Sequence, residues 1–333
     1  MGQKLIPRFV ANTLWVLRSG VPLRAVLIGL SLLLAFVSIS PVSAGSTVSG
    51  TISSPGTWTL ASSPYTVTGH VTIAAGVTLT IDPGVTVKFD TGRVMEVEGT
   101  LVARGTSTSS VTFTSSAASP AAGDWGYIKF KDGPSPSVGT TFDGSGNYVS
   151  GSILEYCSVE YGGVYDHVVE NATYINACTF TNNSGTAVDA SFYAGSYKSV
   201  RIINSVFSQN SGDAIRDAMN ATITGNTITN SGGIRIMGGA TTVENNLITN
   251  SVAHEAAIVS NSGGEPGSTV VISNNQIRDN SSHGIWICGM PISSTDTVTI
   301  SNNTIVRNSG RGIVIGALPG QMCGGNATIH VTN

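Results

Sequence analysis

Charge and aromatic rings are scarce in this chain. Of its 333 residues, 11% are charged and 7% are aromatic, whereas 40 residues are glycine. Beyond residue 44 the strong helix formers give way to Val, Ile, Thr, Ser, Asn and Gly. These residue types favour short strands and tight turns over long helices. The composition therefore predicts an all-β protein.

Several motifs of known chemistry are also missing. The sequence contains no phosphate-binding glycine loop, no Cys/His spacing typical of a zinc site and no nucleophile-elbow pentapeptide. These absences argue against nucleotide chemistry, a structural zinc and an α/β-hydrolase mechanism. Any site must instead be built from scattered polar side chains.

The first 44 residues differ from the rest. An apolar run over residues 25–39 ends at the small residues of Pro41-Val42-Ser43-Ala44, and it follows four basic residues (Lys4, Arg8, Arg18 and Arg24). This pattern predicts a signal peptide over residues 1–44, with an uncleaved membrane anchor as the alternative. No cysteine follows the run, which argues against a lipoprotein. We therefore expect a secreted or cell-surface protein.

The charge of the remaining chain limits its partners. Without residues 1–44 the chain has 12 basic and 19 acidic residues, a net charge of −7. A negative surface argues against nucleic acid and anionic membranes. It also disfavours polyuronates unless Ca²⁺ bridges the charges, so Ca²⁺ is the one cofactor that we consider.

An internal repeat dominates the second half of the chain. Val271-Ile272-Ser273-Asn274-Asn275-Gln276-Ile277 and Thr299-Ile300-Ser301-Asn302-Asn303-Thr304-Ile305 are near copies of each other. Equivalent positions follow at intervals of 21, 27, 21, 20, 29 and 28 residues (Cys157, Cys178, Ser205, Asn226, Asn246, Asn275 and Asn303). Each copy precedes a second short element, typified by Gly-Ile-x-Ile. A unit near 21 residues fits one coil of three short strands and is too short for a propeller blade.

Such coils are stable only when they stack. One coil cannot bury its apolar side alone, so neighbouring coils pair strand on strand, roughly 4.8 Å apart. Like residues then lie on like, giving an aliphatic stack (Ile228, Ile248, Ile277 and Ile305) and an asparagine stack (Ser205, Asn226, Asn246, Asn275 and Asn303). We predict a single-stranded parallel β-helix, a solenoid, with irregular coils over residues 45–150 and regular repeats over residues 151–333.

The cysteines follow this frame. Cys157 and Cys178 share one repeat position, so we expect buried thiols in neighbouring coils. Cys288 and Cys323 begin or lie in loops one coil apart. Because export permits disulfides, these two are the disulfide candidates.

Three segments of the first half carry a family resemblance. Residues 76–89 (GVTLTIDPGVTVKF), 99–106 (GTLVARGT) and 123–126 (GDWG) look like the opening of bacterial secreted right-handed β-helix repeat proteins, of the pectate-lyase-like fold group. The resemblance covers nearly all of the chain after residue 44 and implies that the β-helix is right-handed. That group includes polysaccharide lyases, glycoside hydrolases, sugar epimerases and adhesins, so the resemblance says little about activity.

The longer coils place their extra residues at one phase of the repeat. Insertions at one phase project from one side of a solenoid, which is the expected binding face (residues 189–198, 260–269, 288–297 and 316–326). The strands before these loops align six residues in one outward row (Asp189, Arg216, Arg235, Val259, Trp286 and Val314). An exposed Trp286 beside Arg and Asp would stack on a sugar ring. The alternative is a surface ion pair with an isolated surface tryptophan.

The catalytic candidates come from the same row. The resemblance to pectate lyases implies acids that hold Ca²⁺ and a basic residue that abstracts a proton, and Asp189 with Arg216 or Arg235 would imitate this arrangement. Asp166 and His167 form the only adjacent Asp-His pair and are weaker acid/base candidates. Hydrolysis would need paired carboxylates at a defined separation, and Asp213 and Asp217 are close in sequence.

Two functions remain open from the sequence. The leading hypothesis is a secreted or surface β-helix that binds a polysaccharide or cell-surface glycan, or serves as a structural module. The rival is a polysaccharide lyase or glycoside hydrolase that acts on extracellular polysaccharide.

The C-terminal residues also predict an interaction. Residues 331–333 overlay residues 300–302, and nothing after them closes the coil. An open end leaves strand backbone and apolar interior uncovered. We therefore expect either a truncated reading frame or an end covered by a partner, with self-association through that end.

Overall fold

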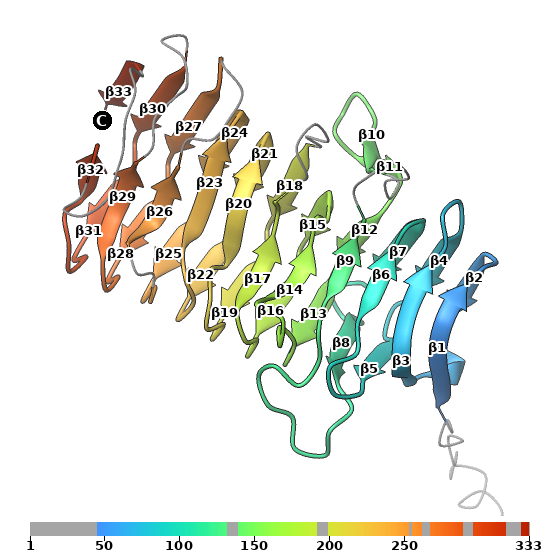
Figure 1. Cartoon of the computed structure of the whole chain (residues 1–333). Helices are drawn as coiled ribbons and strands as arrows, with labels where there is room; N and C mark the ends of the chain where they lie inside the picture. Colours follow the sequence, from blue (N-terminus) through green and yellow to red (C-terminus); the bar gives the residue numbers. More distant parts are fainter. Residues whose placement is uncertain are drawn as a thin grey trace, which may run out of the picture. The chain divides into compact units, whose positions relative to one another are not determined.

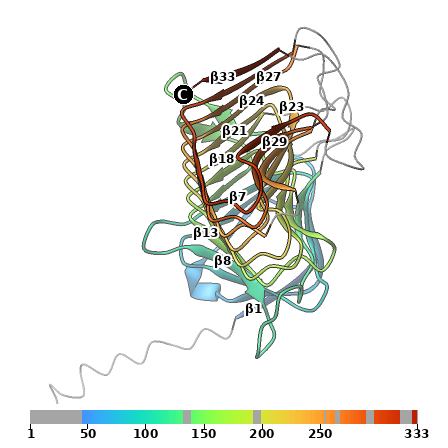
Figure 2. The same cartoon turned by 90° about the vertical axis from the view of Figure 1, so that its left-hand side faces the viewer.

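The computed structural model describes residues 45–131, 139–191, 199–252, 255–261, 267–288, 296–317 and 328–332. Its strands stack from β1 to β33, and Figure 2 gives a second view of the stack. Within the described residues the only helix is a short 3₁₀ turn, Leu60–Ser62. The predicted all-β class is confirmed. The expected signal peptide, and most residues of the four insertion loops, lie outside the described residues.

Nearly all strands belong to three parallel ladders, which together wind as a β-helix. Ladder 1 contains β5 (Thr86–Phe89), β8 (Val111–Ser115), β13 (Cys157–Glu160), β16 (Thr179–Thr181), β19 (Val206–Ser208), β22 (Thr227–Thr229), β25 (Leu247–Thr249), β28 (Gln276–Arg278) and β31 (Thr304–Val306). Ladder 2 contains β6 (Met95–Val97), β9 (Ile128–Phe130), β14 (His167–Glu170), β17 (Thr186–Asp189), β20 (Ile215–Met219), β23 (Ile234–Gly238), β26 (Ala256–Ser260), β29 (His283–Ile287) and β32 (Ile313–Ile315).

Ladder 3 forms a separate sheet. It contains β2 (Gly56–Trp58), β4 (Thr78–Ile81), β7 (Thr100–Arg104), β12 (Ile153–Glu155), β15 (Tyr174–Asn176), β18 (Val200–Ile203), β21 (Ala221–Thr224), β24 (Ala240–Glu244), β27 (Thr269–Ser273), β30 (Thr297–Ser301) and β33 (Thr328–Thr332). At the N-terminal end, β1 (Ser46–Ile52) pairs with β3 (Tyr65–Ile73), and β3 pairs with both β5 and β6. Ladders 1 and 2 thus begin on one long strand.

The irregular and regular coils form one continuous β-helix. Strands β7, β8 and β9 of the first half pair in parallel with β12, β13 and β14 of the second. Between β9 and β12 the chain forms an antiparallel hairpin, β10 (Thr141–Phe142) with β11 (Tyr148–Ser150). At the other end, Ile300 pairs with Val331 and Ser301 with Thr332, as the sequence overlay predicts.

The aliphatic stack has the predicted register. Ile228, Ile248, Ile277 and Ile305 are consecutive partners, and the first three are fully buried. Each isoleucine covers the one below it, so the interior is a column of apolar side chains. Burial of such columns is the main stabilising contribution to a solenoid.

The asparagine stack is also confirmed. Asn226 Nδ2 donates to Asn246 Oδ1 at 3.0 Å, and Asn246 Nδ2 donates to Asn275 Oδ1 at 2.9 Å. Each side chain also donates to a backbone carbonyl of a neighbouring coil, as Asn275 does to Val243. The buried turn amides are therefore satisfied along the whole stack.

A second stack lies five residues further along each coil. Asn183 donates to Asn210 at 2.9 Å, and Asn280 donates to Asn308 at 2.8 Å. Ser231 and Ser251 occupy this position in the two coils between. From β19 to β31, turns at both ends of each ladder 1 strand thus carry side-chain amides or hydroxyls in these stacks.

The cysteines agree with the repeat frame where they are described. Cys157 and Cys178 are free, buried thiols, and the backbone N–H of Cys157 donates to Cys178 Sγ at 3.4 Å. Burial raises the pKa of the Cys157 thiol well above its ordinary value. Cys288 is disulfide-bonded. Its predicted partner, Cys323, lies outside the described residues.

In the described part of the chain, no helix has the length and apolar character needed to cross a membrane.

Candidate functional site

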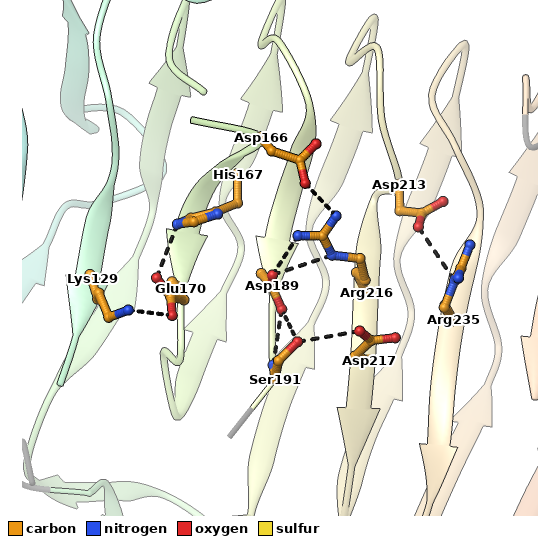
Figure 3. A network of polar contacts seen from close by, with 10 residues as sticks. All are labelled: Lys129, Asp166, His167, Glu170, Asp189, Ser191, Asp213, Arg216, Asp217 and Arg235. Carbon is orange, nitrogen blue, oxygen red and sulfur yellow. Dashed lines mark hydrogen bonds and ion pairs between the residues drawn. The ribbon is translucent and has the colours of Figure 1, made fainter. Parts of the chain in front are cut away.

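The outward row exists and is longer than predicted. Register pairs on ladder 2 connect the nine side chains in two runs, Glu96 to Arg216 and Arg235 to Val314 (Glu96, Lys129, Glu170, Asp189 and Arg216; Arg235, Val259, Trp286 and Val314). Between the runs, Ile215 pairs with Ile234 directly before Arg216 and Arg235, and the register then shifts. The first six, from Glu96 to Arg235, are the charged part of the row. The last three are the apolar part. Figure 3 shows most of the charged part with the polar residues around it.

Arg216 is the centre of the charged part. Its Nη2 lies 2.7 Å from Asp189 Oδ2, and its Nη1 lies 2.8 Å from Asp166 Oδ2. Burial lowers the pKa of Arg216, but the hydrogen bonds to these two carboxylates outweigh it and raise the pKa above its ordinary value. Arg216 therefore stays charged and fixed in place.

Asp189 has little capacity left for chemistry. Its side chain is buried, Oδ2 accepts from Arg216, and Oδ1 accepts from the backbone and hydroxyl groups of Ser191. A carboxylate with both oxygens engaged positions its partners and does not attack a substrate. Our prediction that Asp189 neighbours Arg216 is confirmed, and the contacts make Asp189 a positioning residue.

Asp166 and His167 point to different partners. Asp166 is largely exposed and reaches Arg216, whereas His167 Nε2 lies 3.0 Å from Glu170 Oε2 (Figure 3). Lys129 binds the other oxygen of Glu170 at 2.7 Å. The two adjacent residues therefore form no acid/base dyad with each other.

Arg235 differs from Arg216 in how it is paired. Its Nε lies 3.7 Å from Asp213 Oδ2, and its Nη2 lies 3.9 Å from Glu255 Oε2. These distances allow attraction but exceed hydrogen-bond length. The Nε atom is buried and has no hydrogen-bond partner. The Arg235 side chain as a whole is 36% exposed and makes only these long ion pairs, so its guanidinium is well placed to bind an oxygen atom of a ligand.

Two further carboxyl groups lie beside these arginines. Burial raises the pKa of Asp213, and the nearby guanidinium groups of Arg235 and Arg216 only partly oppose it. Burial, and then the negative charge of Asp189, raise the pKa of Asp217. Acids with raised pKa values hold their protons to higher pH and are suited to proton donation.

A hollow of about 150 Å³ opens among these groups. Asp166, Asp213, Arg216 and Arg235 line it together with small and hydroxyl-bearing residues. Its floor contains Gly212 and Gly232, where an added Cβ would lie 2.4 Å and 2.6 Å from backbone atoms of the coil below. Close stacking of the neighbouring coils beside the hollow thus requires glycine at these two positions. Donors and acceptors surround it, as a sugar with several hydroxyls would need.

The prediction of an exposed Trp286 is wrong. Trp286 occupies the predicted row position between Val259 and Val314, but its side chain is only 1% exposed. It packs with Ala256, Val259, Cys288 and Val314 in a small apolar cluster outside the main core. Its Nε1–H donates to the carbonyl of Gly316 at 2.9 Å. The ring is covered and satisfied, so it offers no face to a sugar.

Ca²⁺ has no ready site in the part of the chain that the structure describes. Within those residues no group of three or more His, Cys, Asp or Glu side chains is arranged to hold a metal. A cation site would need a ligand's own oxygens in addition.

An aromatic cluster lies near the charged part of the row and was not predicted from the sequence. Tyr127 stacks on His167, with ring centroids 5.1 Å apart, and Tyr165 meets Tyr127 edge-on at 5.9 Å. Burial, and then the charge of Glu96, raise the pKa of Tyr127. Tyr127 lies in an irregular coil outside the repeat frame. The Tyr165-Asp166-His167 run was the one available signal.

Two family models match the chain, one after the other. Residues 50–200 match a pectate-lyase-like β-helix domain, and residues 192–330 match a right-handed β-helix region. The chain is therefore a right-handed parallel β-helix repeat protein. A search of curated proteins finds no match.

Three solved structures are similar in fold at low identity. An alginate lyase from Paenibacillus sp. str. FPU-7 is 14% identical, with a TM-score of 0.32, over 78% of this chain and 93% of that one. Endopolygalacturonase I from Stereum purpureum, complexed with two galacturonates, is 12% identical, with a TM-score of 0.35, over 87% and 92%. The A-module of mannuronan C-5 epimerase AlgE4 from Azotobacter vinelandii is 13% identical, with a TM-score of 0.33, over 86% and 91%.

Proposed function

We propose that this chain is a secreted or cell-surface β-helix protein that binds a polysaccharide across the outer face of ladder 2. The observation that carries the proposal is the hollow beside Arg235, whose partly exposed guanidinium makes only long ion pairs, 3.7 Å to Asp213 and 3.9 Å to Glu255. A sugar oxygen in the hollow would accept a hydrogen bond from this guanidinium. Exposed carboxylates such as Asp166 would accept from neighbouring sugar hydroxyls.

The charges around the hollow favour a neutral glycan. Among the described residues around the hollow, five carboxyl groups lie beside two guanidinium groups, those of Arg216 and Arg235 (Asp166, Asp189, Asp213, Asp217 and Glu255). A uronate carboxylate would meet repulsion there unless Ca²⁺ or another cation bridged the charges. A hydroxyl-rich neutral chain has no such cost.

A second candidate function is cleavage of the bound polysaccharide. The raised pKa of Asp213, which burial causes, favours this candidate because a protonated acid beside a bound sugar can protonate a leaving oxygen. In such a hydrolysis Asp213 would donate the proton to the leaving oxygen, and a second, ionised carboxylate, with Asp166 as the candidate, would activate the attacking water, while Arg235 would bind the sugar. Asp189 and Arg216 keep the surrounding side chains in position.

One screen tests both functions. Purified protein from residue 45 onward is titrated against neutral and uronate polysaccharides, with Ca²⁺ and with a chelator, while new reducing ends and unsaturated ends are measured. Arg235→Ala should weaken binding. The matched control is Arg104→Ala on ladder 3, which removes an arginine paired with Glu155 at 2.8 Å and should leave binding unchanged. Equal affinity of both variants and the wild type would place the ligand elsewhere.

Self-association through the C-terminal coil stays a prediction. Val331 and Ile315 are each 52% exposed there, and an apolar surface on unpaired strands favours contact with another chain. Sedimentation over a range of concentrations would detect it, and a constant monomer would contradict it.

A further inference from the structure

Tyr165 differs from every other aromatic residue in the described part of the chain. Its side chain is 51% exposed, and it is the one aromatic among the large apolar side chains exposed at that level. Val164 beside it is 48% exposed. Exposed aromatic surface is unfavourable in water, and an isolated instance next to a polar hollow points to a contact with a ligand.

Tyr165 is partly held by its neighbours. Its ring meets Tyr127 edge-on at 5.9 Å. Gly126 and Gly92 lie close to it, since an added Cβ would come within 3.1 Å of its Cδ2 and 3.4 Å of its hydroxyl oxygen. About half of the side chain is still exposed to solvent and free for a ligand.

Tyr165 is joined to the hollow through its neighbour in the sequence. Asp166, the next residue, lines the hollow and lies 2.8 Å from Arg216 Nη1. In Figure 3, Asp166 reaches toward Arg216 from the strand that carries His167. From β14, which Tyr165 precedes, to β23, which carries Arg235, there are three strand spacings, or roughly 14 Å along the helix. A glycan of several sugar units would span that distance.

We propose that Tyr165 is a stacking subsite for one pyranose ring of the glycan whose next units occupy the hollow at Arg235. This inference rests on the proposed function. The apolar C–H face of the sugar lies on the exposed face of Tyr165, and Asp166 accepts a hydrogen bond from a sugar hydroxyl. Tyr165 thus supplies the sugar-stacking ring that was expected of Trp286.

The length of the glycan tests the subsite. Xylo-, cello- and manno-oligosaccharides of two to six units, and oligogalacturonides with Ca²⁺, are titrated calorimetrically against the protein from residue 45 onward. Tyr165→Ala should weaken binding of the longer oligosaccharides by roughly three- to tenfold, the usual worth of one aromatic contact. The shortest oligosaccharide that binds should be unaffected. Arg235→Ala should weaken all lengths.

Two variants separate stacking from other roles. Tyr165→Phe keeps the ring and should bind as the wild type does. Tyr148→Ala removes a tyrosine that lies under Arg104, on the ladder 3 side, and should also leave affinity unchanged. Unchanged binding of all lengths by Tyr165→Ala, with weaker binding by Arg235→Ala, would overturn the subsite and leave the proposed function standing. A wild-type protein that binds none of the probes would overturn both.

Discussion

The two parts of the outward row occupy the same position in successive coils but have opposite character. From Glu96 to Arg235 the side chains are charged and joined in ion pairs, and all but the buried Asp189 are partly exposed. From Val259 to Val314 they are apolar and buried in a cluster of their own. Both parts lie on one ladder. The difference comes from the side chains themselves, which form ion pairs in the charged part and pack against one another in the apolar part.

This contrast separates scaffold from site. Alternation along a strand decides whether a side chain points into the core or away from it. It does not decide whether an outward side chain meets water or another part of the protein. The charged part retains an open hollow, and it is the part where a ligand can bind.

The largest expected effect of a single change is in the apolar part. Trp286→Ala should lower the free energy of unfolding by about 3–5 kcal/mol, because it removes a buried ring and leaves a cavity. Arg235→Ala at the equivalent position should cost only about 0–1 kcal/mol, since its ion pairs are long and partly exposed. Denaturant unfolding of both variants measures the contrast. A loss below about 1 kcal/mol for Trp286→Ala would mean that the ring is not covered.

Removing one asparagine of the stack should cost a similar amount of stability in coils of both parts. Asn226→Ala lies in a coil of the charged part and Asn275→Ala in a coil of the apolar part, and each removes two donated hydrogen bonds. Both should lose about 1–3 kcal/mol, because buried amide and carbonyl groups are left unpaired. Thermal and denaturant unfolding would show it. A large difference between the two losses of unfolding free energy would mean that the stability of the asparagine stack depends on the side chains of the outer face.

A smaller effect depends on pH and is confined to the charged part. Burial raises the pKa of Asp213, so the folded protein binds more protons than the unfolded chain between the ordinary value of 3.8 and the raised one. The stabilising contribution is complete below 3.8 and is lost as pH rises through that window. Asp213→Asn should remove this loss, so its stability relative to the wild type should increase with pH.

Glu170 supplies the opposite case for comparison. Burial raises its pKa, but hydrogen bonds from His167 and Lys129 outweigh burial and hold the pKa below the ordinary value. Its contribution to stability is present at neutral pH and is lost as pH falls through the lowered pKa. Unfolding curves of Asp213→Asn and Glu170→Gln with parallel pH dependence would refute the two environments described for these acids.

The scaffold could be predicted from the sequence because like residues stack on like. The spacing of Asn226, Asn246, Asn275 and Asn303 supplied both the coil length and the register. The second stack had an equally clear signal, since Asn or Ser occurs five residues after each of these positions. The antiparallel hairpin β10–β11 falls in a coil without a repeat partner, so no register could place it.

The site was predictable only in part. The pairing of Asp189 with Arg216 follows from the register alone. The burial of Trp286 arises from packing against Val259 and Val314 and from its hydrogen bond to Gly316, whereas Tyr165 contacts residues of an irregular coil far away in the sequence. Side-chain exposure on the outer face is a tertiary property that a repeat pattern does not contain.

Hydrogen exchange in the presence of a bound glycan tests the central claim most directly. Amide exchange is compared, with and without the best ligand of the screen, in peptides from both parts of the row. The account predicts protection in β14, β17, β20 and β23, around Asp166, Arg216 and Arg235, and no change in β29 and β32, around Trp286. Protection confined to β29 and β32 would contradict it and place the ligand on the apolar part.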